Sequence, residues 1–348
     1  MHENRSTTAI EIELLTHAQP ISGRVKTGNL NRDFIGWLDL LSAIEDSRRP
    51  TANTAPDQPT SAACTPPADT HVDTIVDRVL SALGELPGVA AVALGGSRAR
   101  GQGLPDSDVD IAVYYSRADP PAIEELHRIA TELHDPGAPK LLGGYGEWGP
   151  WINGGALITI AGRRTDLLLR ELEQVEAVIR NCRRGIVESV YTPGHPHAFH
   201  THIYAGEAHH NQPLYDRYGT LAALKNLTVP YPQPLREALV RRFGWEMSFS
   251  IPLADKAIKR GDHAYAAGIV FRCIACMVQV IFAVNERYFL NEKRSVAAAT
   301  AMTRSPPNFD TRVTLCLPGG SQDPTAALTA LRDDVAALID EGQRDDVD

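Results

Sequence analysis

The chain has little cysteine and no excess of positive charge. Its 348 residues include five cysteines, an odd number spread over a long sequence, which excludes a disulfide framework and fits a reducing compartment. Basic residues number 34 and acidic residues 43, giving a net charge of -9, so the surface as a whole should repel a phosphate backbone. We therefore expect no general nucleic-acid binding.

Long apolar runs are scarce as well. Residues 266–284 are apolar enough to raise the question of a membrane span, but Arg272 and Gln279 interrupt them. A mid-span arginine costs about 2.5 to 3.5 kcal/mol on insertion, so we expect a buried helix and no membrane partner. The first residues, MHENRSTTAIEIELL, lack the basic start and apolar run of a secretory signal. We expect a cytoplasmic protein.

The overall composition is that of an ordinary soluble globular protein. Hydrophobic residues make up 43% of the chain and charged residues 22%, and the mean hydropathy is -0.20. The length suggests two domains and an additional segment such as a tail. We expect an N-terminal extension over 1–69, with a short helix at 33–46 and a flexible linker, an α/β domain over 70–190, an α-helical domain over 191–341, and an acidic tail over 342–348.

Apolar periodicity and turn signals predict an α+β fold, in which a small mixed-sheet domain precedes an α-helical bundle. In the first domain the predicted elements are helix 71–86, strands 89–94 and 109–115, helix 121–134, strands 156–160 and 165–169, and helix 172–184. After residue 213 the pattern predicts helices alone, at 235–250, 254–260, 264–289, near Ser295 and at 324–339, with a break at Pro252.

The stretch from Gly95 to Tyr115 holds the residues best suited to chemistry. Gly95 and Gly96 follow a buried strand, where missing side chains let backbone N–H groups approach an anion, and Ser97 could cap the short helix that follows. Asp108 and Asp110 flank Val109, so their side chains share one face of a strand, roughly 6 to 7 Å apart. Two carboxylates at that spacing can share a hard cation such as Mg²⁺.

A third acid, Asp166, begins an apolar strand after the turn at Gly162. Three acids around two metal ions about 3.5 to 4 Å apart are typical of sites for in-line attack on phosphorus. The alternative is a tight turn followed by a polar strand entry, but the gap, the strand-turn-helix context and the third acid together favour catalysis. No G-x-x-x-x-G-K-[ST] motif occurs, and the glycines at 101 and 103 do not complete a dinucleotide-binding fingerprint.

This pattern over residues 89–170 resembles the nucleotidyltransferase superfamily that includes DNA polymerase beta. Within it, the chain is similar to small bacterial enzymes of the kanamycin and lincosamide type with a helical C-terminal domain. The resemblance implies that Gly96 and Ser97 touch a nucleoside triphosphate and that Asp108 and Asp110 bind two Mg²⁺ ions. It also implies that Asp166 binds one ion and acts as, or assists, the general base.

Three further positions are candidates for nucleotide binding. Gly95 could use its backbone, and Arg98, just after the turn, could steady phosphates, although a short helix could equally point it to water. The chain has six lysines against 28 arginines, so Lys293, in FLNEKR, draws notice. It could reach the β- or γ-phosphate of a nucleotide, and the alternative is a solvated helix end.

Six of the twelve histidines lie between His195 and His210. Their spacings have neither the H-E-x-x-H form nor a neighbouring cysteine, so we interpret them as loop histidines that contact base or acceptor rather than as a zinc site. Cys273 and Cys276 lie in an apolar segment and are predicted to be buried, inert thiols.

The resemblance implies a transferase that uses ATP or another nucleoside triphosphate. The expected reaction moves AMP to a hydroxyl of a small molecule or a protein and releases pyrophosphate. A toxin–antitoxin or regulatory module that modifies a partner protein or tRNA is one alternative, and a non-catalytic nucleotide-binding module is another. The acceptor, the preferred nucleotide, the role of residues 1–69 and the oligomeric state stay open at this point.

Overall fold

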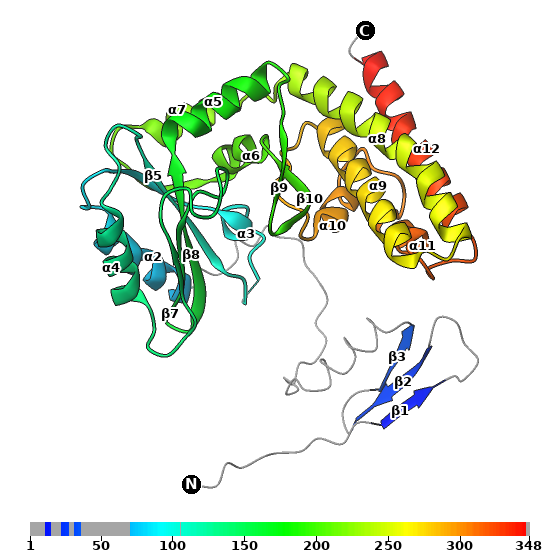
Figure 1. Cartoon of the computed structure of the whole chain (residues 1–348), viewed down its shortest axis with the longest axis horizontal. Helices are drawn as coiled ribbons and strands as arrows, with labels where there is room; N and C mark the ends of the chain where they lie inside the picture. Colours follow the sequence, from blue (N-terminus) through cyan, green and yellow to red (C-terminus); the bar gives the residue numbers. More distant parts are fainter. Residues whose placement is uncertain (1–10, 15–21, 28–30, 36–69, 105, 346–348) are drawn as a thin grey trace, which may run out of the picture. The chain divides into compact units, whose positions relative to one another are not determined.

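The chain forms two compact units, Met1–Pro66 and Pro67–Asp348 (Figure 1). The structure is a computed structural model and describes residues 11–14, 22–27, 31–35, 70–104 and 106–345.

The first unit contains an antiparallel three-stranded sheet of β1 (Glu11–Leu14), β2 (Ser22–Lys26) and β3 (Asn31–Ile35). The helix predicted over 33–46 is wrong at its first three residues, which lie in β3. There Asp33 pairs with Arg24 and Ile35 with Ser22, so pairing with β2 overrides the local helical period. Residues 36–46 and the predicted linker lie outside the described residues.

The second unit is built on a six-stranded mixed sheet with the order β11-β4-β5-β8-β7-β6. Only β5 and β8 run parallel, while the other neighbouring strands are antiparallel. The strands are β4 (Val89–Leu94), β5 (Val109–Tyr115), β6 (Leu141–Gly143), β7 (Gly155–Ile160), β8 (Arg163–Glu171) and β11 (Gln212–Asp216). The predicted strands at 89–94 and 109–115 are confirmed at the same residues.

Helices cover both faces of this sheet (Figure 1). α2 (Thr70–Leu83) and α4 (Ile123–Leu133) pack in one core with Ile111 and Val113 of β5. α5 (Leu172–Arg183) and α6 (Ile203–His210) pack in the other core, which includes Tyr114. Since side chains alternate along a strand, Asp110 shares the face of Tyr114 and looks toward the second core.

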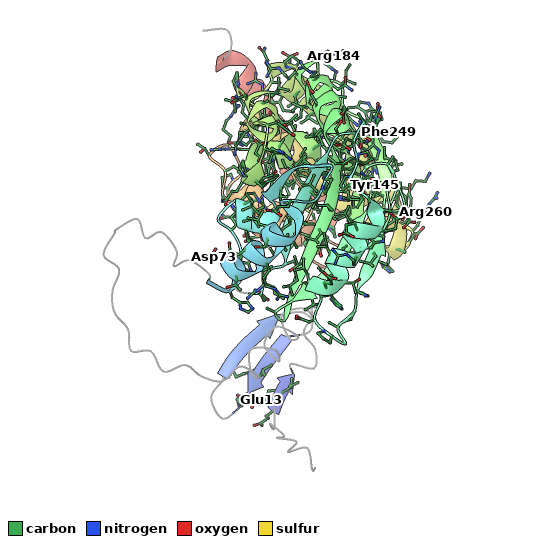
Figure 2. All side chains as sticks on the ribbon, turned by 90° about the vertical axis from the view of Figure 1, so that its left-hand side faces the viewer. Glu13, Asp73, Tyr145, Arg184, Phe249 and Arg260 are labelled. Atoms are coloured by element: carbon green, nitrogen blue, oxygen red, sulfur yellow. The ribbon has the colours of Figure 1, made fainter. Side chains whose placement is uncertain are left out.

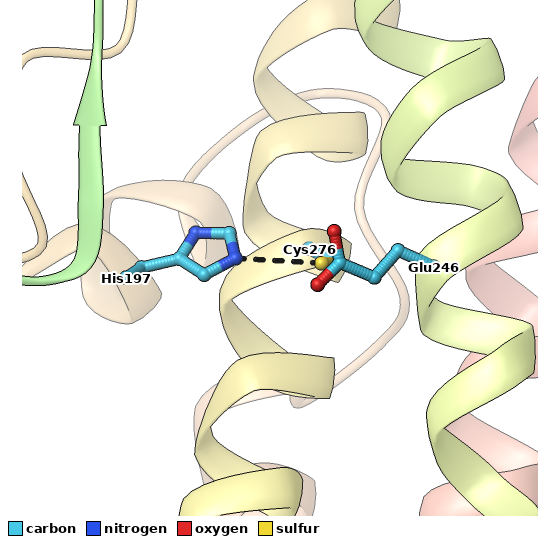
Figure 3. Close-up of side chains that lie close together, drawn as sticks. All are labelled: His197, Glu246 and Cys276. Atoms are coloured by element: carbon cyan, nitrogen blue, oxygen red, sulfur yellow. Dashed lines mark hydrogen bonds between the residues drawn. The ribbon is translucent and has the colours of Figure 1, made fainter. Parts of the chain in front are cut away.

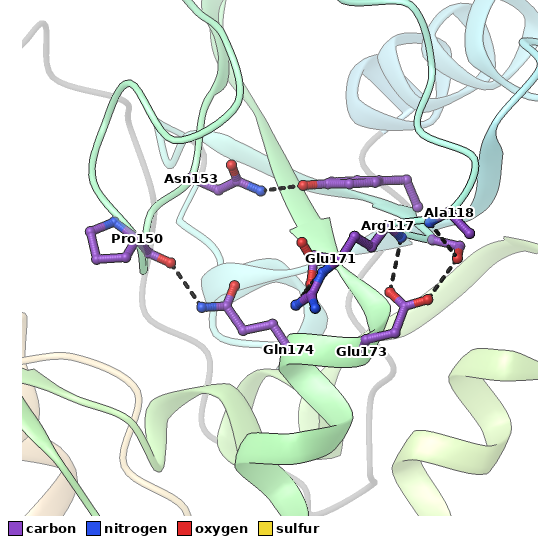
Figure 4. Close-up of polar contacts among 9 residues, drawn as sticks. Arg117, Ala118, Pro150, Asn153, Glu171, Glu173 and Gln174 are labelled. Carbon is purple, nitrogen blue, oxygen red and sulfur yellow. Dashed lines mark hydrogen bonds and ion pairs between the residues drawn. The ribbon is translucent and has the colours of Figure 1, made fainter.

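Polar contacts tie the carboxyl ends of β5 and β8 together (Figure 4). The Arg117 guanidinium pairs with Glu171 at the end of β8, and the Arg117 N–H donates to Glu173 Oε2 at 3.0 Å in the first turn of α5. Asn153 Nδ2 donates to the Tyr115 hydroxyl at 2.7 Å. Tyr145, labelled in Figure 2, packs its ring 4.9 Å from that of Tyr115. These contacts fix the register of the strands that carry the acids.

The rest of the second unit is mainly helical, as predicted, and the α+β fold class is confirmed. A hairpin of β9 (Ser189–Thr192) and β10 (His195–His200) precedes most of the helices. The helices beyond it are α6, already described, and α7 (Thr220–Asn226), α8 (Gln233–Lys259), α9 (His263–Val284), α10 (Ser295–Thr300), α11 (Phe309–Cys316) and α12 (Pro324–Asp345).

Two features of this region differ from the sequence-based expectation. α8 runs through Pro252 without the predicted break, because the buried Met247, Ile251 and Ala254 hold the helix against the core on both sides of the proline. β11 pairs with β4, so the sheet takes a strand from beyond residue 190. The predicted mixed-sheet and helical domains are therefore interleaved along the chain.

α9 is long and apolar enough to cross a membrane by length and composition alone. Of its most apolar window, 72% is buried inside the protein. Such burial is what the core helix of a folded domain shows, as the sequence led us to expect.

Candidate active site

The structure brings the three predicted acids together on the two central strands of the sheet and the loop that leads into one of them. Asp110 on β5 and Asp166 on β8 are direct partners in the parallel register, so both carboxylates lie side by side on the same face. Asp108 stands two residues before Asp110, with the guanidinium of Arg164 4.0 Å from its Oδ1.

The two strand acids lie in an electrostatic environment that disfavours their charge. Burial, together with the charges of Asp108 and Glu207, raises the pKa of Asp110 above its usual value. Burial, with Asp110 and Asp108, raises the pKa of Asp166 to about 6. Lys293 opposes both shifts. The acids act on one another as a coupled group whose repulsion the nearby cations Lys293, Arg164 and Arg170 offset only in part.

These residues fit a hard divalent cation such as Mg²⁺. Three carboxylates supply only oxygen ligands, which is the donor set that Mg²⁺ prefers. Oδ1 of Asp166 is buried and has no hydrogen-bond partner among the described residues, although buried polar atoms are normally paired. A cation held by Asp108, Asp110 and Asp166 would satisfy this atom and offset the repulsion among the acids.

The glycine turn is shaped by its approach to Asp110. Gly95 is the N-cap of α3 (Gly96–Ala99), and its N–H donates to the Asp110 backbone oxygen at 2.8 Å. Gly96 has a φ of +61°, and a Cβ at this position would overlap Oδ2 of Asp110. Ser97 lies inside α3, so its predicted role as the cap is wrong. Its contact with a nucleotide stays a prediction.

Arg98 organises the loop that leads into Asp108. Its Nε donates to the Asp108 backbone oxygen at 3.1 Å, and its Nη2 donates to the backbone oxygens of Ser107 at 2.7 Å and Leu104 at 3.2 Å. This guanidinium therefore holds backbone carbonyls at the entry to β5. The predicted phosphate contact of Arg98 stays a prediction.

Lys293 comes from the helical half of the unit and lies in the turn before α10. Its charge acts on both Asp110 and Asp166 and lowers the pKa of each. The structure thus brings this lysine within electrostatic range of the acids, with its side chain exposed and available to an anionic ligand.

Two charged residues behind the acids were missed by the sequence analysis. Arg170 on β8 is 3% exposed, and its guanidinium donates to both oxygens of Glu207 on α6, at 2.9 and 3.0 Å. Arg170 shares the strand parity of Asp166, so the period of two could have placed it on the same face. Glu207 carried no such signal, because no sequence pattern predicted α6.

The histidines are not the loop residues that the sequence analysis predicted. His197 and His200 lie on β10 and His202 caps α6, and each is at most 2% exposed. A contact with base or acceptor needs an accessible ring, which these three do not offer. Cys273 and Cys276 are buried, as predicted. A cavity of about 600 Å³, lined mainly by α8 and α12 residues and also by Arg304 from the segment between α10 and α11, includes none of the predicted acids.

The family model for the nucleotidyltransferase domain matches residues 76–139, which contain the glycine turn, Asp108 and Asp110. The chain therefore contains a nucleotidyltransferase domain. A second family model, a domain of unknown function (DUF4037), matches residues 204–293. No curated protein matches the sequence.

Two solved structures have low similarity to this nucleotidyltransferase. A nucleotidyltransferase-like protein from Exiguobacterium sibiricum is 12% identical, covers 78% of this chain and 75% of its own, and has a TM-score of 0.37. Spectinomycin adenyltransferase AAD(9) from Enterococcus faecialis, solved with ATP and spectinomycin, is 16% identical, covers 77% and 99%, and has a TM-score of 0.27. At these TM-scores neither neighbour adds to the argument.

The nucleotidyltransferase domain indicates a transferase of nucleoside monophosphates, without specifying the nucleotide or the acceptor. The match ends before β8, so the place of Asp166 in the site depends on the strand register alone.

Proposed function

We propose that the protein is a Mg²⁺-dependent nucleotidyltransferase that moves AMP from ATP to a hydroxyl of a small molecule or a protein and releases pyrophosphate. The observation that supports this most directly is the parallel register that sets Asp110 beside Asp166, with Asp108 two residues away. Mg²⁺ bound by these acids would stabilise charge on the phosphates and orient the reacting oxygens.

The chain's own residues supply the remaining parts of the reaction. Asp166, whose pKa in the metal-free protein is about 6, is mostly ionised at neutral pH, and its carboxylate is the proposed acceptor for the proton of the acceptor hydroxyl. The hydroxyl oxygen then bonds to the α-phosphorus while the bond to the β-phosphate oxygen breaks, and pyrophosphate leaves. Lys293 carries the positive charge that an anionic leaving group requires.

A screen of pyrophosphate release tests the proposal. ATP, GTP, CTP and UTP are each incubated with Mg²⁺ and pools of hydroxyl-bearing acceptors, including cationic ones because the net charge is -9. We expect release with ATP that depends on one pool. Calorimetry that finds Mg-ATP binding, but no release with any pool, would instead support a non-catalytic nucleotide-binding module. Turnover that appears only with a protein or tRNA captured on the enzyme would support the regulatory module.

Replacing Lys293 should weaken nucleotide binding rather than chemistry. We expect Lys293→Met to raise the KM for the nucleotide about tenfold and to change kcat little, because a hydrogen bond to a charged group contributes about 1.5 kcal/mol at the low end, which is close to a tenfold change in affinity. Steady-state kinetics measure this effect. Lys256→Met, at an exposed position on α8, is the matched control and should behave like the wild type. An unchanged KM in Lys293→Met would remove Lys293 from the nucleotide site.

The effect of Mg²⁺ on stability should depend on pH. The pKa of Asp166 in the folded protein is about 6 against an ordinary 3.8, so the metal-free fold holds this proton more tightly than the unfolded chain. Without Mg²⁺, this group's contribution to the free energy of unfolding is therefore greatest below about pH 4 and declines as pH rises toward about 6.

Mg²⁺ needs the ionised form, so its stabilising effect should be present near pH 7.5 and mostly lost near pH 5. Thermal melts with and without Mg²⁺ across this range measure the difference. Asp166→Asn should weaken the Mg²⁺ effect and reduce its pH dependence, and the remainder should come from Asp110, whose pKa is also raised. A Mg²⁺ effect on Tm that is equal at both pH values would show that Asp166 does not bind the ion.

A further inference from the structure

Three side chains from separate elements converge inside the helical region (Figure 3). His197 comes from β10, Glu246 from α8 and Cys276 from α9, and one ligand atom of each lies within 4.8 Å of the other two. Nε2 of His197 is 3.5 Å from Sγ of Cys276. Zinc bonds of about 2.0 to 2.3 Å to nitrogen and sulfur place the two ligand atoms of a tetrahedral site about 3.5 Å apart. The observed distance between Nε2 and Sγ equals this expected distance between two zinc ligands.

The ring of His197 is held as a metal-binding histidine usually is. Its Nδ1 lies 3.3 Å from Nε2 of His200, whose own Nδ1 lies 2.5 Å from the hydroxyl of Ser189 on β9. When Nδ1–H of His197 donates to Nε2 of His200, and Nδ1–H of His200 donates to the Ser189 hydroxyl, Nε2 of His197 keeps a lone pair that points to Cys276. Ligating histidines commonly donate the other ring N–H to such a partner, which fixes the tautomer and the orientation of the ring.

The charges of the cluster also suit a divalent transition metal ion. A Cys276 thiolate and the Glu246 carboxylate together carry two negative charges against the two positive charges of Zn²⁺, and the Arg272 cation paired with Glu246 brings the sum over these groups to +1. Arg272, one turn before Cys276 on α9, pairs with Oε1 of Glu246 and orients the carboxylate. Without metal, burial raises the pKa of the Cys276 thiol, so zinc binding would form the S–Zn bond and release the thiol proton to solvent.

We propose that His197, Glu246 and Cys276 bind one Zn²⁺ ion, which ties the β9–β10 hairpin to α8 and α9. Three protein ligands leave the fourth position for water, a set typical of zinc sites with an open position. The oxygen-only acids of the active site and this sulfur- and nitrogen-containing cluster thus select different metals.

The zinc site would also position part of the active site. His195 Nδ1 lies 3.3 Å from Glu292 Oε2, and the His197 N–H donates to Glu292 Oε1 at 3.1 Å. Glu292 directly precedes Lys293, whose charge acts on the acids. The zinc site would thus help to hold Lys293 near the acids. This role of Lys293 rests on the proposed nucleotidyl transfer, whereas zinc binding itself does not.

Metal content and cobalt spectroscopy of the full chain, purified without a histidine tag, test the proposal. We expect one equivalent of zinc after dialysis against a weak chelator and, in the cobalt-loaded protein, a thiolate-to-cobalt charge-transfer band. Cys276→Ser should remove that band and weaken zinc binding more than about 100-fold. Cys273→Ser is the matched control, since Cys273 is equally buried one turn earlier and its thiol donates to the Met247 backbone oxygen instead.

Glu246→Gln gives a second variant at a partly exposed position, and we expect it to weaken zinc binding while the fold survives. Asp110→Asn should keep full zinc binding, which separates this site from a failure of nucleotidyl transfer. The proposal is overturned if the wild type lacks the cobalt band, or if Cys276→Ser and Glu246→Gln bind zinc as tightly as the wild type.

Discussion

Asp110→Asn should lower the rate of nucleotide transfer on the order of 10³-fold while the protein becomes no less stable. Asparagine keeps the size of the side chain but removes a negative charge needed to hold Mg²⁺. In the metal-free fold, burial and neighbouring acids raise the pKa of Asp110, so its charge works against folding. We therefore expect the Tm without Mg²⁺ to be unchanged or higher. Labelled-nucleotide transfer and thermal melts measure the two effects.

Asp106→Asn is the matched control for this prediction. Asp106 lies in the loop that leads into β5, four residues before Asp110, and it is exposed. Its replacement should leave transfer within a few-fold of the wild type. A lower Tm in Asp110→Asn would mean that the carboxylate stabilises the fold by contacts rather than serving the metal. Full activity in this variant would refute the proposed enzyme.

The acids of the candidate site could be predicted because their placement depends on short-range rules. The period of two along a strand puts Asp108 and Asp110 on one face, and the same rule places Asp166 and Arg170 together on β8. The sequence could not show that β5 and β8 are neighbours in register, since strand order is a property of the whole sheet. For Lys293 the sequence suggested only a contact with the β- or γ-phosphate of a nucleotide, and its electrostatic effect on the acids was not predicted.

The features that the sequence did not predict depend on long-range contacts. His197 and Cys276 are 79 residues apart, so no local spacing could reveal their convergence. The histidines lacked a nearby cysteine in the sequence, yet the fold supplies one from α9 and a carboxylate from α8. β11 joins the sheet by pairing with β4, more than 100 residues earlier, for the same reason.

Gly96→Ala should cost both stability and activity, in contrast to Asp110→Asn. The φ of +61° at Gly96 is left-handed, which costs an alanine about 1 to 2 kcal/mol, and the new Cβ would overlap Oδ2 of Asp110. We expect a Tm lower by a few degrees. Displacement of the Asp110 carboxylate from the metal should reduce transfer by about 10² to 10³-fold.

Gly95→Ala is the neighbouring control, because Gly95 has a φ of -118° and a Cβ there would lie 3.7 Å from the Asp110 backbone oxygen, an ordinary contact. It should retain most of the activity. The Tm cost of Gly96→Ala should shrink in an Asp110→Ala background, where the carboxylate that the new Cβ would meet is absent. An equal cost in both backgrounds would assign the destabilisation to backbone strain alone, and the glycine would then serve the turn rather than the approach to the catalytic acid.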